Sequence, residues 1–431
     1  MHFSKFLALF LLYLSVGQSS KILTVTFFAS KSFRNAFDPL FFELAERGHN
    51  VTIVSPINPS QKHANIREIN LPPKEIQSLE TSKFSNFFER RKEKEVTNII
   101  LAGPIILDSC RQFLEMKAIQ ELISEKFDLI VGVGLGNECS FGYIHQFNTS
   151  LILLSPITPI FALTDFIGAS APRSFVPSIF GGYSDNMNFF ERMDNLLKTT
   201  WYTLYYSWIY LPTMDAMNRE FFGPETPSVV DIAKNTSLVL VNSHLAVNYP
   251  RPFMPDLIDV GGLYCRPAKP LPKDIEDFVG SAQDGFIYFR IPMFGDQDYN
   301  VRVAENKQFG LKLELGEITE STLMASIKQV LDDPKYSQTA KTLSNVFRDR
   351  ITQPLDTAVY WIEYVIRHRG APQLRSPARD LNFFQYYCID VVFVLLSTLL
   401  ASFYVASKTL KLILTTLSPK VEPSKKKVKV K

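Results

Sequence analysis

The 431-residue sequence has only four cysteines, Cys110, Cys139, Cys265 and Cys388, and no two of them form a CxxC pair. Disulfide-rich scaffolds need many cysteines, and zinc sites need cysteines or histidines at short, regular spacings. The cysteine pattern therefore predicts neither a disulfide framework nor a zinc site. We expect no bound metal and no resident cofactor.

The chain before Lys408 also has no excess of positive charge. Lysine and arginine total 46 and aspartate and glutamate 43, a net charge of +3. From Lys408 onward, eight lysines stand against Glu422 alone, so this end carries +7 and the rest of the chain −4. A mildly acidic body does not attract the phosphates of nucleic acid. Nucleic acid is therefore excluded as a partner.

Long apolar runs occur only at the two ends of the chain. Near the N-terminus, Lys5 precedes an apolar run over residues 6–16, which is too short to span a bilayer, and Gly17 and Ser19 lie where a peptidase would cut. A buried first helix is the alternative interpretation. The strand pattern that begins directly afterwards at Lys21 favours a signal peptide over residues 1–19.

The second apolar run, residues 383–406, is long enough to cross a bilayer as one helix. Asp390 is its one acidic residue, and Tyr386 and Tyr387 fit an interfacial aromatic belt. The lysine-rich tail at 407–431 places the C-terminus in the cytoplasm by the positive-inside rule. We therefore predict a single-pass type I membrane protein with its body in the lumen.

Short motifs indicate which compartment this is. Lys427 and Lys429 lie at the places of a dilysine signal that returns membrane proteins to the endoplasmic reticulum, although a tail that only binds anionic lipid is an alternative. Asn50, Asn148 and Asn235 each open an Asn-x-Ser/Thr sequon within the segment predicted to be lumenal. We expect a glycoprotein of the endoplasmic reticulum membrane.

Strand and helix patterns alternate along the first half of the body. An apolar run is followed by an amphipathic helix over 34–47, a left-handed stop at Gly48 and a second apolar run. Strands alternating with helices predict a parallel sheet that is covered on both faces, an α/β fold. The strands are expected at 21–28, 51–55, 127–131, 151–154 and 237–241.

Residues 189–219 predict a long helical region that is rich in aromatic side chains such as Trp201, Tyr206 and Trp208. They could line an apolar acceptor pocket, or they could serve packing and a membrane-proximal surface. Lys198 and Pro212 confine the apolar run and so exclude a second membrane span.

Proline-rich sequence between Pro250 and Pro272 predicts a connection between two domains. Beyond it we expect strands at 286–289 and 310–315, a helix capped by Thr319 and another opening at Pro334. The stretch from there to residue 368 holds only about 80 residues, which is small for an independent α/β domain. A segment of this second domain is missing.

Several motifs resemble one family in wording and in order. The general ones are ELAERGHNV at 43–51, VGGL at 260–263, GFIYF at 285–289, IPMFGDQ at 291–297 and WIEYVIRHRGAPQLR at 361–375. Together they resemble the membrane-bound UDP-glycosyltransferases, the UDP-glucuronosyltransferase-like group of animals. FVP at 175–177 and SDNM at 184–187 resemble its insect branch.

The resemblance implies a GT-B type fold of two facing Rossmann-like domains. Here they would be an acceptor-type domain at 20–265 and a truncated UDP-sugar domain with returning helices at 266–380, followed by the membrane helix and tail. The family transfers a sugar from a UDP-sugar to a small lipophilic acceptor with inversion at the anomeric carbon, a detoxification chemistry. UDP-sugar is its co-substrate.

The catalytic pair that the resemblance implies is not found in this chain. The family's base, a histidine shortly after the first strand, falls on Phe33, whose ring cannot accept a proton. Its supporting acid falls on Val133, with Glu138 as a shifted candidate. Asp296 and Gln297 do match the pair that hydrogen-bonds the donor sugar.

The donor half is also shortened. Family members have a phosphate turn, further βα units and a His-Gly-Gly motif between the strand ending at Phe289 and the segment starting at Ile291, where this chain has Arg290 alone. A splice variant, a gene-model error and a real loss all fit. Two functions follow: sugar transfer in the endoplasmic reticulum, or a catalytically inactive relative that binds lipophiles or pairs with family members as a homo- or hetero-oligomer.

Overall fold

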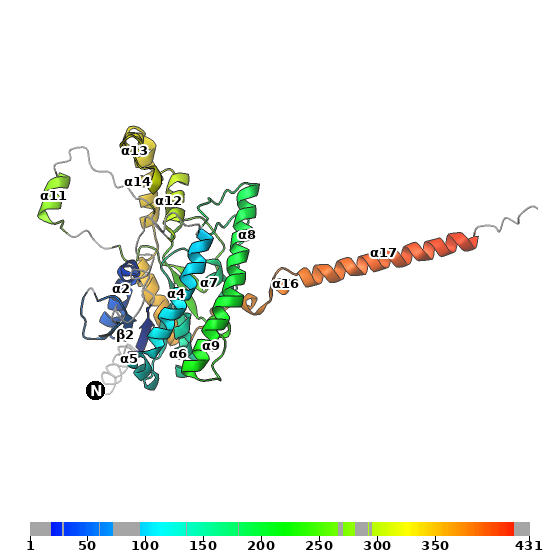
Figure 1. Cartoon of the computed structure of the whole chain (residues 1–431), viewed down its shortest axis with the longest axis horizontal. Coiled ribbons are helices and arrows are strands. Elements are labelled where there is room, and N and C mark those ends of the chain that lie inside the picture. The colour runs from blue at the N-terminus through cyan, green and yellow to red at the C-terminus, as the bar shows by residue number, and fades with distance from the viewer. Residues whose placement is uncertain are drawn as a thin grey trace, which may run out of the picture. The chain divides into compact units, whose positions relative to one another are not determined.

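Seven parallel strands form one sheet, in the order β3-β2-β1-β4-β5-β6-β7, among the residues that the computed structural model describes. Those residues are 19–27, 30–59, 61–71, 95–134, 136–179, 181–265, 270–280, 292 and 295–417, with the backbone alone for 95–102 and 278–280. Figure 1 shows the helices that surround the sheet. The strands are β1 (Lys21–Val25), β2 (Asn50–Ser55), β3 (Ile66–Asn70), β4 (Leu129–Val133), β5 (Ser150–Ser155), β6 (Leu238–Val241) and β7 (Leu257–Asp259). The strand order reverses between β1 and β4, which places a crevice outside their carboxyl ends.

Both faces of the central part of the sheet are buried, and this is why β1, β4, β5 and β6 are nearly continuous apolar runs in the sequence, whereas the edge strand β3 is largely polar. Neighbouring residues of a strand point to opposite faces. Ile22 of β1 therefore belongs to one buried apolar cluster and Leu23 to the other. The predicted α/β class with a parallel sheet is confirmed.

Two sets of helices cover the faces. One face packs against α4 (Glu95–Glu115), α6 (Gly142–Phe147), α9 (Leu211–Phe222) and α10 (Val229–Lys234), and the other against α2 (Lys31–Glu46) and α15 (Pro354–Arg367). Helix α2 begins after Ser30, whose Oγ accepts the Phe33 N–H, and it ends just before Gly48, where φ is +92°. The stop at Gly48 agrees with the prediction, whereas the helix begins three residues earlier than the predicted start at residue 34.

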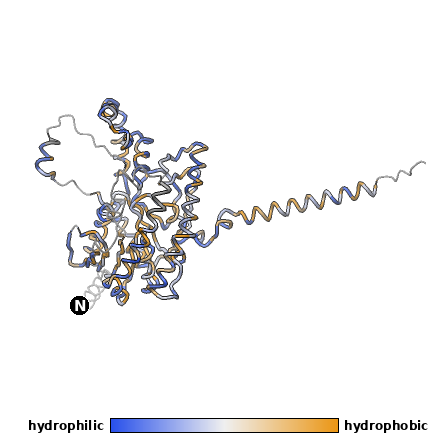
Figure 2. The backbone as a smooth tube through the Cα atoms, viewed as in Figure 1, coloured by the Kyte–Doolittle hydropathy of each residue, from blue (hydrophilic) through white to orange (hydrophobic). Residues whose placement is uncertain are grey.

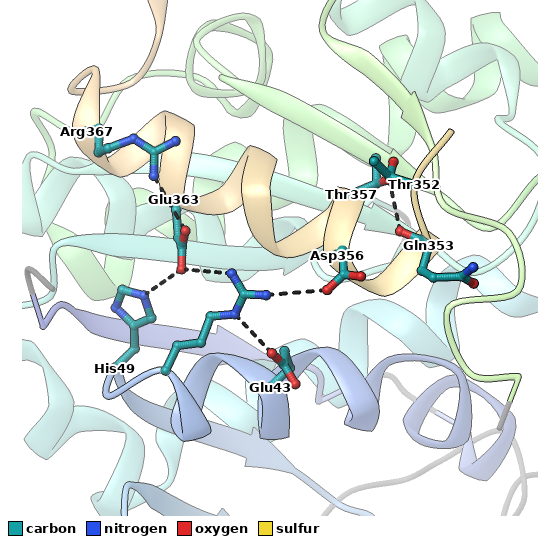
Figure 3. A network of polar contacts seen from close by, with 9 residues as sticks. Glu43, His49, Thr352, Gln353, Asp356, Thr357, Glu363 and Arg367 are labelled. Carbon is teal, nitrogen blue, oxygen red and sulfur yellow. Dashed lines mark hydrogen bonds and ion pairs between the residues drawn. The ribbon is translucent and has the colours of Figure 1, made fainter. Parts of the chain in front are cut away.

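Helix α15 comes from the C-terminal part of the body but completes the core of the N-terminal sheet. Its apolar side, including Val359 and Ile362, is fully buried with β5, β6 and α2. Figure 3 shows the polar contacts that tie it to the end of α2, where Arg47 pairs with Glu43 at 3.0 Å and with Glu363 of α15 at 3.7 Å. The burial of this face of the sheet therefore depends on α15, which lies far from the strands in the sequence.

His49 lies in the turn after α2 and takes part in the same contacts. Its Nδ1 accepts the Ser20 N–H at 3.2 Å, and its Nε2 lies 3.7 Å from Glu363 (Figure 3). The imidazole thus joins the turn to the start of β1 and to α15, at the amino ends of the strands and away from the crevice.

A disulfide joins Cys110 of α4 to Cys139, in the short helix that follows β4. The cysteine pattern predicted no disulfide framework, and this one pair was not identified from the sequence. Both cysteines are completely buried. The 29 residues between them place the pair beyond any short motif, and only the packing of α4 against the loop after β4 brings them together. Cys265 and Cys388 are exposed free cysteines.

The second half of the body is helical where it is described. Residues 310–315, expected as a strand, have no strand geometry, because a strand needs a hydrogen-bonding neighbour and no described residue supplies one. The strand expected at 286–289 lies outside the described residues. The proline-rich stretch expected to be a connection contributes β7 to the sheet.

The helices of this part of the body are α11 (Lys273–Gly280), α12 (Gln297–Asn306), α13 (Glu320–Asp332, capped by Thr319 as predicted) and α14 (Pro334–Arg348).

The chain divides into two units, the body up to Arg379 and a second unit from Asp380. The second unit contains α16 (Phe383–Tyr386) and the 29-residue α17 (Ile389–Leu417), the one helix among the described residues that is long and apolar enough to cross a membrane (Figure 2). Cys388, with φ of +53°, separates the two helices. The apolar helix thus begins six residues later than expected and includes Lys408 and Lys411.

The domain boundary at 265/266 stays a prediction. The signal peptide and the tail signal also stay predictions, since they lie outside the described residues.

A buried polar layer joins α12 to the carboxyl end of β6. The Tyr299 hydroxyl of α12 donates to Asn248 Oδ1, and Asn248 Nδ2 donates to Ser243 Oγ at 2.9 Å. Arg251 donates to the Tyr299 oxygen at 3.4 Å and to the Pro159 carbonyl at 2.9 Å. Tyr299 is fully buried, so this layer fixes where α12 lies on the sheet.

Asp259, at the end of β7, is the acidic group of this layer and is expected to make folding pH-dependent. Burial raises the pKa of its carboxyl from 3.8 to about 6, against the opposing effects of Ser243 and Arg251. Between these two values the folded chain holds a proton that the unfolded chain has lost, so stability falls as pH rises through this window. Unfolding in detergent at pH 4.5 and 7.5 should show Asp259→Asn losing less stability than the unmodified chain over this range, by up to about 3 kcal/mol. Equal losses in the two proteins would contradict the assignment.

The disulfide is expected to be a main stabiliser of the body. Replacing Cys110 and Cys139 together by serine removes a cross-link that closes a loop of about 30 residues, which should lower the free energy of unfolding by roughly 3–4 kcal/mol. The matched control is Cys265→Ser, which changes an exposed free thiol and should have little effect. Thiol titration of the denatured chain should detect two free cysteines, and a count of four would refute the cross-link.

Candidate functional site

Phe33, which the family resemblance assigns to the place of the base, is part of the core. It lies in the first turn of α2, just beyond the carboxyl end of β1, and its side chain is only 4% exposed. Its ring centroid lies 5.0 Å from that of Phe37, one helical turn further on. The position offers no atom that could accept a proton, and its surroundings are apolar.

Val133, which the resemblance assigns to the supporting acid, ends β4 and is 4% exposed. It belongs to the same buried apolar cluster as Phe33. The two positions at which the catalytic pair was expected therefore hold apolar side chains that pack in one core.

Glu138, the shifted candidate for the acid, is buried to 1% exposure in a different place. Its two carboxylate oxygens accept the hydroxyls of Tyr206 at 2.7 Å and Tyr210 at 2.8 Å, and one of them also accepts the Gly136 N–H at 3.1 Å. The two tyrosines belong to the apolar cluster on the sheet face opposite to that of Phe33. Glu138 is thus engaged in a buried cluster and does not face the base position.

This cluster holds a π-helical turn, Tyr206–Tyr210, between α8 (Phe189–Tyr205) and α9. The rings of Tyr206 and Tyr210 stack at 5.1 Å. Burial, followed by the negative charge of Glu138, raises the pKa of both hydroxyls well above their ordinary value. Both therefore stay protonated at neutral pH and act as hydrogen-bond donors to the carboxylate.

Asp296 and Gln297 lie at the start of α12, where the buried polar layer holds that helix against the sheet. Both side chains are half-buried. Asp296 Oδ2 accepts a hydrogen bond from Asn300 Nδ2 at 2.6 Å. The structure brings this pair to the carboxyl side of β6 but does not bring it together with Glu138 in a single polar cluster.

A polar cavity of about 590 Å³ opens beside the same helix. Its charged groups are balanced: Lys312 pairs with Asp298 at 3.1 Å, and Arg302 pairs with Glu305 at 3.1 Å and donates to the Gly182 carbonyl at 2.8 Å. Paired cations leave little positive potential for a diphosphate, whereas alternating donors and acceptors suit a polyhydroxyl ligand. The lining comprises Gly181, Gly182, Tyr183, Ser184, Glu191, Asp298, Arg302, Glu305, Asn306 and Lys312.

The three sequon asparagines lie at the opposite edge of the sheet. Asn50 opens β2, Asn148 ends α6 just before β5, and Asn235 precedes β6, so all three are found at the amino ends of strands. Each side chain is exposed. Glycans at these positions would leave the crevice at the carboxyl ends open.

Sequence reasoning missed Tyr299 and the partners of Glu138. The spacing of Tyr202, Tyr206 and Tyr210, one helical turn apart, was a usable signal for a tyrosine row on one side of a helix. Nothing in the sequence connected that row to Glu138, which precedes it by about seventy residues. Among the described residues, no group of three or more His, Cys, Asp or Glu side chains could hold a metal ion.

Comparison with known proteins gives a consistent result. The family model for "UDP-glucoronosyl and UDP-glucosyl transferase" matches residues 21–291 and 288–426. UDP-glycosyltransferase UGT5 of Dactylopius coccus is 27% identical over 525 residues, which cover 96% of this chain and 97% of that protein. UDP-glucuronosyltransferase 2B23 of Macaca fascicularis is 24% identical over 498 residues, with 92% of this chain and 93% of that protein covered.

Two solved structures can be set beside the fold. The glycotransferase of kitacinnamycin has a TM-score of 0.47 and 12% identity, over 82% of this chain and 100% of that one. Phytolacca americana UGT2, complexed with UDP-2fluoro-glucose and pterostilbene, has a TM-score of 0.41 and 10% identity, over 81% and 100%. The family model itself covers nearly all of the chain from β1 to beyond α17. On that match, this chain belongs to the family of UDP-glucuronosyl and UDP-glucosyl transferases.

Proposed function

We propose that this chain serves the transfer of sugars from UDP-sugars to small lipophilic acceptors as the acceptor-side partner of an active family member, and that it does not catalyse the transfer alone. The observation that carries the proposal is the burial of Phe33 and Val133 in one apolar core. Without a base, the acceptor hydroxyl keeps its proton into the transition state, a deficit on the order of 10²–10⁴ in rate.

The donor side supports the same proposal. The two stretches that match the family model meet at residues 288–291, where the sequence lacks the phosphate turn. The alignment with UDP-glycosyltransferase UGT5 spans 525 positions, whereas this chain has 431 residues. At least 94 positions of that alignment are therefore gaps in this chain. We attribute these to the donor half, which leaves Asp296 and Gln297 without the rest of a nucleotide site.

A second candidate function is unaided sugar transfer. It is favoured by the polar cavity beside α12, which has room for a sugar and lies on the helix that Asp296 and Gln297 open. A few hydrogen bonds of about 1 kcal/mol each to a sugar do not offset the cost of immobilising a charged nucleotide. We therefore place it second.

For the setting, we propose the lumenal side of the endoplasmic reticulum membrane. The apolar helix α17 supports membrane association, and a lysine-rich tail follows it. The exposure of Asn50, Asn148 and Asn235 is compatible with glycans on the lumenal body. The disulfide between Cys110 and Cys139 is compatible with this setting, because disulfides form in oxidising compartments.

The purified full chain is expected to give no detectable turnover with UDP-glucose or UDP-glucuronic acid and a fluorescent phenol as acceptor. Phe33→His alone should not restore turnover, because Val133 cannot orient the new imidazole. Phe33→Leu is the matched control, since it keeps the core apolar and reports any loss of folding. When the chain is co-expressed with an active relative, the two should purify as one complex whose KM for lipophilic acceptors differs from that of the relative alone.

Turnover by the unmodified chain, or turnover gained from Phe33→His, would favour the second candidate. Calorimetric titration with UDP-glucose gives an independent readout. Saturable binding that disappears when Asp296 and Gln297 are both replaced by alanine would show a working donor pair in this chain.

The proposed setting predicts glycans of a defined kind. Endoglycosidase H should shift the chain by up to three steps on a gel, and Asn50→Gln, Asn148→Gln and Asn235→Gln should each remove one. Replacing Lys427 and Lys429 together by serine should make the glycans resistant, because the chain would then move on to the Golgi. A chain without glycans would contradict a lumenal body, and glycans that stay sensitive in the lysine variant would assign retention to another signal.

A further inference from the structure

An apolar stripe runs along the outer side of α8 and the π-helical turn that follows it. We call this stripe the outer face, and it consists of Phe189, Phe190, Met193, Leu196, Leu197, Leu204, Trp208 and Ile209. Phe190 is 72% exposed and Trp208 73%, values that large apolar side chains rarely have in a soluble protein. Phe190, Leu197, Leu204 and Trp208 follow one another at intervals of seven, seven and four residues, which keeps them on one side of the helix.

The outer face also lacks charge over much of its length. No charged residue occurs between Lys198 and Asp215, which leaves two Trp, four Tyr and several aliphatic side chains uninterrupted. Lys198 itself lies at one end of this stretch and pairs with Asp194 at 2.8 Å. Glu191, Arg192 and Asp194 lie among the outer-face residues of the first half of α8, so the uncharged part is the second half and the π-helical turn. A helix with an exposed apolar side and charged residues toward one end is typical of helices that lie in a membrane interface.

The inner side of the same helix fixes which residues point outward. Asn195 is fully buried and accepts the Ser178 N–H at 2.8 Å, and Tyr206 and Tyr210 are bound to Glu138. These contacts span the helix from near its start to the π-helical turn. Trp208, between the two tyrosines, is therefore held on the solvent side, and rotation of the helix cannot bury it.

The route of the chain toward α17 begins beside this helix. The ring of Phe166, at the end of α7 (Phe161–Phe166), lies 6.2 Å from that of Tyr206. Two residues further on, Gly168 is so close to Arg379 that a Cβ there would lie 2.5 Å from the Arg379 backbone nitrogen. The last residue of the body thus lies close to the π-helical turn.

Arg379 is firmly held at that place. Its guanidinium pairs with the buried Asp256 and donates to the carbonyls of Lys234 and Thr236. The chain reaches Ile389, the first residue of α17, ten residues later, a span of at most about 35 Å. When α17 is in a bilayer, the body beside Arg379 therefore cannot move far from the bilayer surface.

We propose that the outer face docks on the surface of the bilayer that holds α17, as a second membrane contact of the body. The occupant is lipid, because the same chain brings a bilayer within reach of the face, and because Trp and Tyr side chains favour the interface between headgroups and acyl chains. The contact would hold the body in one orientation and keep the acceptor-type half next to the phase in which lipophilic molecules dissolve.

Tryptophan fluorescence tests this in the full chain. The sequence has three tryptophans, Trp201, Trp208 and Trp361, and α17 contains none, so quenching by lipid reports on the body alone. The chain is reconstituted in phosphatidylcholine vesicles that contain a phosphatidylcholine brominated near the top of its acyl chain. We expect strong quenching, and Trp208→Phe should remove most of the quenched emission. Trp361→Phe is the matched control, since Trp361 belongs to α15 and packs against the apolar cluster on the other face of the sheet.

A second variant guards against a local effect of the tryptophan change. Phe190→Ser with Leu197→Ser keeps all three tryptophans and the inner contacts, and should reduce lipid quenching while α17 still holds the chain in the vesicle. The proposal is overturned if Trp208→Phe leaves lipid quenching unchanged, or if aqueous iodide quenches Trp208 and lipid does not. It is equally overturned if neither quencher reaches Trp208, because a protein partner would then cover the face.

Discussion

The structure depends on one constraint, which is that a parallel sheet must be buried on both faces. Among the described residues, no single continuous segment of the chain supplies the helices for both faces. Helix α2 covers only part of one face, and α15 completes it from more than a hundred residues beyond β6. Arg47 and Glu363 hold the two helices together at the amino ends of the strands. This C-terminal segment is therefore part of the core that covers the sheet.

The same burial decides the chemistry of the crevice. Phe33 and Val133, which the family resemblance assigns to the base and its supporting acid, extend the core under α2 to the carboxyl ends of β1 and β4. Glu138 is close to Val133 in sequence but belongs to the other side of the sheet, where Tyr206 and Tyr210 occupy its carboxylate. A buried carboxylate needs such donors, so Glu138 serves the packing of the π-helical turn and is not available to orient a base.

That turn connects the interior of the body to its surface. Glu138 binds the inner tyrosines, and this leaves Trp208 and Ile209 exposed on the outside. Cys139 follows Glu138 in the sequence, and its disulfide to Cys110 fixes this segment on the same side of the sheet as the tyrosines. A rigid inner side is what gives an outer apolar face a defined direction, which a membrane contact requires if it is to orient the body.

Local patterns were enough to predict much of this protein. Strands β1, β2, β4, β5 and β6, the stop of α2 at Gly48, the cap of α13, the apolar helix near the C-terminus and the family all followed from the order of residues, because periodicity, capping and motif wording are properties of neighbours in the chain. Strands β3 and β7 were not predicted, because β3 is largely polar and β7 has only three residues. The strand expected at 310–315 was wrong because a strand also needs a partner, and the pattern of one segment does not contain it. The Cys110–Cys139 bond, the tyrosines that bind Glu138 and the anchoring of α12 by Tyr299 join residues from 29 to 72 positions apart. Their pairing, and the choice of which aromatic side chains of α8 are inside and which face outward, depends on how the helices pack on the sheet, so it could be read only from the folded chain.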